Sequence, residues 1–278
     1  MKIVPPYVRE SLQNLFKKNG FLLMRINKRD EFDANIDHWM NLDHLRIHIV
    51  KVPLTDQVLT YRGRSIKDIE PDPYLLSLSS ASGAKNRKLF VDKFVRKISK
   101  YVKPGRTAAD AMSLPMRSDL KSLPEWCSVL PWEKWSVNER MNLYKKQFTA
   151  RRTNSINRIK QNDENIFYSK TTWISHANQF YNLYHSISKN GFRDTSHPIL
   201  NVVINEGTYK FMLSNSGNHR LMCASILGIR SVYVKIGSII NINDIAYWPN
   251  VANGYYSLEE ATKIFFDYFN MKGYGSFV

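Results

Sequence analysis

The segment Gly217-Asn218-His219-Arg220 combines residue types that suit the phosphate-binding start of a helix. Ser216 precedes it, and apolar residues recur at helical spacing after it. The first turn of a helix presents backbone N–H groups outside the helical ladder and the positive end of the dipole. Gly217 allows close approach to the backbone, and Arg220 is a bidentate donor beside His219 and Asn218. The segment predicts an oxyanion site, with phosphate as the expected ligand.

Other polar residues are candidates to complete this site. His197 comes just before Pro198, where a loop could approach the nucleotide, and Asp194 is close to it in sequence. Glu164, with Asp163 beside it, is the candidate catalytic carboxylate upstream. A run of cations with no acidic residue between them is either the solvated face of a helix or a polyanion-binding surface. Its members are Lys145, Lys146, Arg151, Arg152, Arg158 and Lys160.

The cysteines and the N-terminal histidines argue against other chemistry. Cys127 and Cys223 are too few for a disulfide framework and lack metal-ligand spacing, which fits a cytoplasmic protein, and Cys223 is expected in the core. His44 and His48 occur in a strand-like run without the Glu of a metalloprotease helix, so no metal-ligating residues are predicted. No signal peptide is recognisable, and no uncharged apolar run approaches the roughly 18 residues of a membrane span.

The last hundred residues alternate between helical and strand patterns, which predicts an α+β fold with a small mixed sheet. Ser175 is expected to cap a helix that Gly191 ends. Strands are expected over residues 199–204 and 209–213, joined by a hairpin turn at 205–207. A helix then runs from Gly217 to Gly228, and a strand covers residues 232–236. A capping box of Ser257 and Glu260 opens a closing C-terminal helix.

In this order, residues of about 173–237 resemble the ParB/sulfiredoxin superfamily. The shared features are an S-I-x-x-x-G helix end at Ser186 to Gly191, a P-I strand start at Pro198, a G-x-H-R box at Gly217 and an A…L-G helix end at Ala224 to Gly228. The resemblance implies a ParB N-terminal-like nucleotide-binding domain, with the triphosphate at Gly217, His219 and Arg220. ATP is expected ahead of CTP, together with Mg²⁺.

Members of this superfamily differ in chemistry, and the sequence departs from several of them. Sulfiredoxins need a cysteine just before the His-Arg pair, where this chain has Asn218, so a thiol intermediate cannot form there. Relatives that phosphorylate free serine carry Asp where Ser216 stands, and their upstream Glu has no clear counterpart. ParB proteins of DNA segregation continue into a helix-turn-helix region, whereas Trp248-Pro249 and a single aromatic-rich helix follow here.

The sequence predicts two domains. Residues 1–135 are expected to form a larger mixed α/β region of unassigned role, and residues 136–278 are expected to form the nucleotide-binding domain with a preceding basic helix. A helix is expected over 7–18 and strands over 21–26, 45–50 and 57–61. The Ser, Pro and Gly content of residues 71–82 indicates a loop. Residues 86–101 predict a basic amphipathic helix, and residues 113–135 an ordered connector rich in Trp and Pro. Ser136 and Glu139 form a further capping box.

The charge balance points to a polyanionic partner. The chain has 40 Lys+Arg against 24 Asp+Glu, a formal charge of +16. The leading hypothesis is a phosphotransferase (kinase) or NTP hydrolase acting on a hydroxyl of a small metabolite or sugar, or an anionic glycan, in which His219, Arg220 and Glu164 are catalytic. One alternative is a nucleic-acid-binding protein or nuclease that uses the same pocket. Another is a nucleotide-binding module without catalysis.

Overall fold

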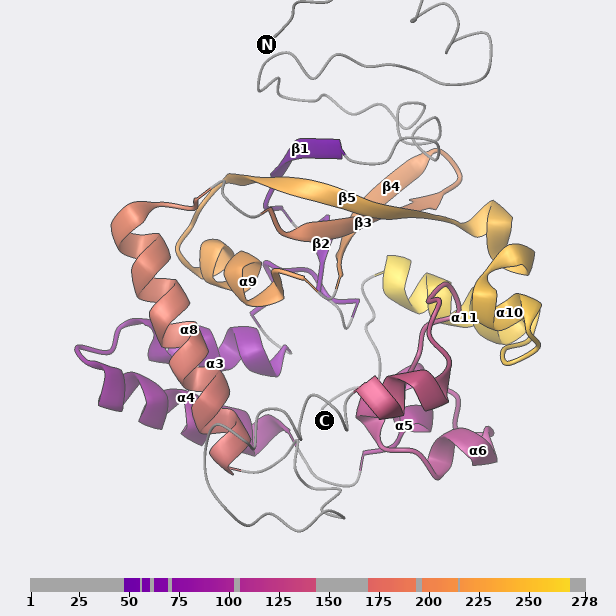
Figure 1. The fold of residues 1–278 in the computed structure, drawn as a ribbon, viewed down its shortest axis with the longest axis horizontal. Helices are drawn as coiled ribbons and strands as arrows, with labels where there is room; N and C mark the ends of the chain where they lie inside the picture. Colours follow the sequence, from indigo (N-terminus) through magenta and orange to yellow (C-terminus); the bar gives the residue numbers. More distant parts are fainter. Residues whose placement is uncertain are drawn as a thin grey trace, which may run out of the picture.

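The computed structural model describes residues 48–55, 57–60, 63–69, 72–102, 106–143, 170–193, 197–214 and 216–270 (Figure 1). Helices and a five-stranded mixed sheet make up the predicted α+β fold. The strands are β1 (His48–Pro53), β2 (Val58–Leu59), β3 (Ile199–Asn205), β4 (Thr208–Leu213) and β5 (Ser231–Asn241). The helices are α3 (Pro73–Ser82), α4 (Arg87–Tyr101), α5 (Ala108–Met112), α6 (Ser118–Lys121), η1 (Glu125–Cys127), α8 (Lys170–Asn190), α9 (Asn218–Ile226), η3 (Ile242–Tyr247), α10 (Pro249–Ala252) and α11 (Leu258–Phe269).

The sheet has the strand order β1-β5-β3-β4-β2. β3 and β4 form the predicted antiparallel hairpin, whose turn residues Glu206 and Gly207 have φ of 39° and 83°, as a two-residue type I′ turn requires. β5 is parallel to β3, β1 is antiparallel to β5, and β2 is parallel to β4. The sheet thus joins strands from both sides of residue 135, and the division into two domains stays a prediction.

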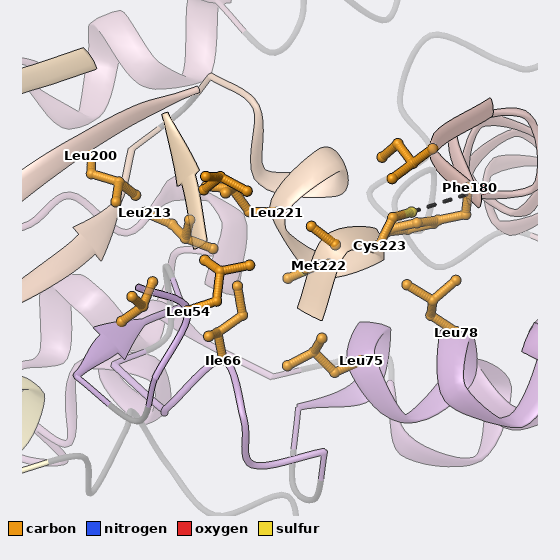
Figure 2. Close-up of a cluster of buried hydrophobic side chains, with 14 of the residues drawn as sticks. Leu54, Ile66, Leu75, Leu78, Phe180, Leu200, Leu213, Leu221, Met222 and Cys223 are labelled. Carbon is orange, nitrogen blue, oxygen red and sulfur yellow. Dashed lines mark hydrogen bonds between the residues drawn. The ribbon is translucent and has the colours of Figure 1, made fainter. Parts of the chain in front are cut away.

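One hydrophobic core lies between the sheet and a group of four helices, α3, α4, α8 and α9. α4 follows the predicted pattern, since its stripe of Phe90, Phe94, Val95 and Ile98 is buried. Phe94 packs on Phe180 of α8 with ring centroids 5.3 Å apart. Figure 2 shows Leu221 of α9 on the side of Leu213 of the sheet, Met222 above Leu75 of α3, and Cys223 against Phe180 of α8. The apolar side of α9 is therefore fixed by helices from two distant parts of the chain.

A second core forms because successive residues of a strand point to opposite faces. Val202 belongs to the first core, whereas Val203 packs with α11 residues such as Phe265. The predicted capping box at Ser257 and Glu260 opens α11. Residues 113–135 form the ordered connector that the sequence predicts, and Trp132 packs edge-on against Trp248 at 5.2 Å. Among the described residues, no helix has the length and apolarity needed to cross a membrane.

Two sequence predictions in the helical layer are wrong. Residues 71–82 are expected from the sequence to form a loop, but Pro73–Ser82 form helix α3. Asp72 caps this helix by accepting hydrogen bonds from the backbone N–H groups of Tyr74 and Leu75, and Pro73 occupies its first turn. Serine can be tolerated inside a helix when its hydroxyl bonds the carbonyl one turn earlier, and the Ser77 hydroxyl donates to the Pro73 carbonyl at 2.6 Å. Ser175 does not cap α8, since that helix already begins at Lys170.

Several predictions lie outside the described residues: the helix over 7–18, the strand over 21–26, Asp163, Glu164, Asp194 and the basic run from Lys145 to Lys160.

Candidate phosphate-binding site

Helix α9 begins where the sequence predicts, directly after Gly217. Gly217 has φ 87° and ψ 5°, in the left-handed region that favours glycine. A Cβ at this position would lie 2.6 Å from Cβ and 2.7 Å from Cα of Pro198. Gly217 is thus required by its backbone conformation and by its contact with the start of β3.

Backbone hydrogen bonds hold this contact in place. The Ile199 N–H donates to the Ser216 carbonyl at 3.0 Å, and the Ser214 N–H donates to the Ile199 carbonyl at 3.2 Å. On the other side, the Lys235 N–H of β5 donates to the Pro198 carbonyl at 2.8 Å. The segment that carries His197 is therefore anchored to both β5 and the loop before α9.

The first turn of α9 retains the features of an anion-binding helix start. Gly217 provides no side-chain cap, and the helical ladder opens with the Leu221 N–H donating to the Gly217 carbonyl at 3.1 Å. The N–H groups before Leu221 precede the internal ladder of the helix and point along its axis. Ser216, next to them, is exposed. This end of α9 thus offers donors and the positive end of the dipole to an anion.

Two buried polar atoms flank the contact between Gly217 and Pro198. His197 Nδ1 and Asn218 Oδ1 are both inaccessible to solvent and have no hydrogen-bond partner among the described residues. Leaving such an atom unsatisfied costs about 1–3 kcal/mol, so a bound group that completes its hydrogen bonding would be stabilised there. The structure therefore brings the sequence candidates His197 and Asn218 to one place.

His219 faces α8. Its imidazole packs on the ring of Phe180 with centroids 4.4 Å apart, and the ring of His176 lies 5.7 Å away at 60°. The Tyr74 hydroxyl of α3 is 3.3 Å from His176 Nδ1. These contacts fix the orientation of His219 through α3 and α8. His176 and Phe180 are four residues apart on one helix face, a spacing that could have indicated them, whereas Tyr74 fell in the segment predicted as a loop.

Arg220 is half-buried at the end of the first turn of α9. Burial lowers the pKa of its guanidinium, because the charged form loses contact with water. A phosphate near this group would compensate for that loss with charge-assisted hydrogen bonds. In the described part of the chain, no group of three or more His, Cys, Asp or Glu residues has the arrangement of a metal site.

An open groove of about 780 Å³ lies away from α9, between residues 113–117 and the start of α11, and sequence reasoning missed it. Its central cation, Arg117, donates to Asp119 from Nε at 2.9 Å and to Glu260 from Nη1 at 2.9 Å. These bonds, led by that to Asp119, raise the pKa of Arg117. The guanidinium also lies over the rings of Tyr255 and Tyr256. Arg117 thus joins residues 117–119 to α11 as a structural clamp.

Cys223 lies in the core, as expected. Its side chain is fully buried, with Sγ 4.0 Å from the Phe180 carbonyl oxygen (Figure 2). Burial raises the pKa of this thiol to about 12, so it is protonated at neutral pH and is no nucleophile there.

Comparisons of the chain with protein-family models, with curated proteins and with solved structures returned no match in any of the three. The resemblance to the ParB/sulfiredoxin superfamily therefore remains a hypothesis based on the motif residues, and the geometry around Gly217 is the basis for the function proposed below.

Proposed function

We propose that the first turn of α9, with His197, binds the phosphates of a nucleoside triphosphate, ATP ahead of CTP, and that the protein is a phosphotransferase or NTP hydrolase. The acceptor would be water or a hydroxyl group of a small metabolite or sugar. A cytoplasmic location belongs to the same proposal, and the two free cysteines, Cys127 and Cys223, support a reducing setting.

One observation carries the proposal: a helix start at a glycine lies beside two buried polar atoms that have no partner among the described residues. The positive φ of Gly217 and its contact with Pro198 bring the N-terminus of α9 next to His197. His197 Nδ1 and Asn218 Oδ1 are the unsatisfied atoms. A nucleotide can satisfy both kinds of atom, because its phosphates accept hydrogen bonds while its sugar and base also donate them.

The residues would have separate roles in phosphoryl transfer. Backbone N–H groups after Gly217 would hold phosphate oxygens, and His219, oriented by Phe180 and His176, would donate to another. Arg220 would neutralise the charge that develops on the transferred group. Glu164 is the carboxylate assigned to activate the attacking hydroxyl or water.

Mg²⁺ fits this site only in part. The ion is usually bound by one or two carboxylates together with phosphate oxygens and water. Residues 197–199 and 214–220 contain no carboxylate, so this part of the chain would hold the phosphates rather than the ion. The carboxylate ligand of the ion would come from another part of the chain, and the ion would neutralise charge on the phosphates.

The test is thermal denaturation with ATP, ADP, CTP or GTP, each with and without Mg²⁺. A nucleotide at 100 times its Kd adds about 2.7 kcal/mol to the stability of the folded state. Arg220→Ala should abolish the shift. Arg230→Ala, which removes an exposed arginine beyond the other end of α9, is the matched control and should retain it. If no nucleotide raises the melting temperature of the wild-type protein, the proposal fails.

Turnover distinguishes the enzyme from a module that only binds. Release of nucleoside diphosphate is measured first with water alone and then with a panel of sugars and hydroxyl-bearing metabolites. Hydrolase activity would release diphosphate without an acceptor, and a kinase would require one. A nucleotide-dependent rise in stability without turnover under any condition would identify a binding module.

A further inference from the structure

Among the described residues, most of the net positive charge lies in one helical layer. Residues 72–102 and 170–193, which form α3, α4 and α8, contain two aspartates and ten cations. The cations are Lys85, Arg87, Lys88, Lys93, Arg96, Lys97, Lys100, Lys170, Lys189 and Arg193. Asp72 caps α3 and is buried, so Asp92 is the one carboxylate in these two segments that reaches solvent.

The other helical group has the opposite character. Residues 106–143 carry five basic and five acidic side chains, and residues 242–270 carry one basic and four acidic. Five ion pairs have both partners among the described residues, and all of them lie in these two segments. Figure 1 shows the two groups at opposite ends of the view, with α3, α4 and α8 on the left and α5, α6, α10 and α11 on the right. Unpaired positive charge and ion-paired side chains therefore lie in different helical groups of the described residues.

The α4 cations are turned to solvent, without carboxylate partners in the described part of the chain. Lys88, Arg96 and Lys100 are exposed, and none of the three forms an ion pair with a described residue. Arg87 donates to the neutral amide of Asn178 at 2.7 Å, and Lys97 lies over the ring of Tyr101. Arg96 and Lys100 lie about one helical turn apart and repel one another, whereas Asp92 lies one turn from both Lys88 and Arg96 and offsets part of their charge. The net charge of this face is still positive, so an anion that covers it would be bound favourably.

A nucleic acid fits this surface better than a lipid bilayer. A helix that binds a membrane inserts an apolar face, but Phe90, Phe94 and Ile98 of α4 are fully buried in the core. From Lys88 to Lys100 the helix rises about 18 Å, at 1.5 Å per residue. That length corresponds to about five base pairs of duplex, at 3.4 Å for each phosphate of a strand.

We infer that the solvent face of α4, flanked by α8, is a docking surface for the phosphate backbone of a nucleic acid duplex, bound without sequence preference. Lys88, Arg96 and Lys100 contact the phosphates, and Lys85, Lys93 and Lys97 extend the positive field along the same helix. This surface is separate from the first turn of α9 and does not depend on the nucleotide proposal.

The test uses a fluorescently labelled 20-base-pair DNA duplex of mixed sequence and measures anisotropy at salt concentrations from 50 to 200 mM. The triple variant Lys88→Glu/Arg96→Glu/Lys100→Glu is compared with Lys121→Glu/Lys134→Glu/Lys263→Glu. The control changes net charge by the same amount, at exposed lysines of the other helical group. Circular dichroism establishes that each variant is folded. Because glutamate near the end of α4 opposes the helix dipole, a milder variant with glutamine at positions 88, 96 and 100 accompanies the first.

We expect wild-type binding to weaken steeply with salt, and the glutamine variant to reduce the slope of log K against log[salt] by about 3 units, near 0.9 for each phosphate that the protein no longer neutralises. The control variant should keep more of the wild-type slope than either α4 variant. The inference is overturned if the duplex does not bind, or if the α4 glutamate variant and the control glutamate variant lose affinity for the duplex equally.

Discussion

The contact between Gly217 and Pro198 gives the most direct test of the site geometry, through the substitution Gly217→Ala. An L-residue in the left-handed region costs about 1–2 kcal/mol. The new methyl group would also lie 2.6–2.7 Å from Pro198 atoms, one of them in the backbone, so the start of β3 would have to move. Overpacking of this kind costs about 1–3 kcal/mol. We therefore expect Gly217→Ala to lower the free energy of unfolding by about 2–5 kcal/mol.

Gly228→Ala separates the two contributions. Gly228 ends α9 with φ 72°, but a Cβ there would meet no atom within 4 Å, so only the backbone penalty applies. Urea denaturation of both variants should show Gly217→Ala to be the less stable by about 1–3 kcal/mol. Equal losses of stability would refute the close approach of Gly217 to Pro198, and with it the position of His197 beside α9.

Two further predictions concern the core and the clamp. Because burial raises the pKa of Cys223 from 9.0 to about 12, its contribution to stability is complete below pH 9 and is lost as the pH rises toward 12. Cys223→Ala should make the fall in unfolding free energy over that pH range shallower. An unchanged dependence of the unfolding free energy on pH would contradict the raised pKa of the Cys223 thiol. Arg117→Met should cost about 1–3 kcal/mol in urea denaturation, since it removes the bonds to Asp119 and Glu260. Lys121→Met, at an exposed lysine, should cost less than about 0.5 kcal/mol, and comparable losses would show that the clamp contributes little.

The local signals in the sequence were sufficient for the elements around the site. The start of α9 at Gly217, the turn at Glu206-Gly207 and the capping box at Ser257 each depend on residues close together in the chain. Glycine is needed where φ is positive, and the capping boxes satisfy backbone donors at helix starts. Such requirements can be predicted from a few neighbouring residues, without knowledge of the rest of the fold.

Contacts between distant segments could not be read in this way. Tyr74 and His176 are 102 positions apart, and no pattern within either segment indicates that they meet. The prediction for residues 71–82 is wrong for a local reason, because the helix start at Asp72-Pro73 outweighs the serine content that is typical of a loop. Similarly, the basic face of α4 is evident in the sequence, whereas its separation from the ion-paired helices follows only from tertiary structure.

The two edges of the sheet have a consequence for the synthesis of this chain. Only four residues separate β1 from β2, yet these strands lie at opposite edges and enclose β3, β4 and β5. About 150 residues separate β2 from its partner β4, so at ~5–20 residues per second the early strands wait roughly 10–30 s on the ribosome for their neighbours. Conversely, a fragment that starts at Lys170 would expose both outer strands of a three-stranded sheet to pairing with other chains. Any shortened version meant to stay monomeric should therefore keep residues 48–59.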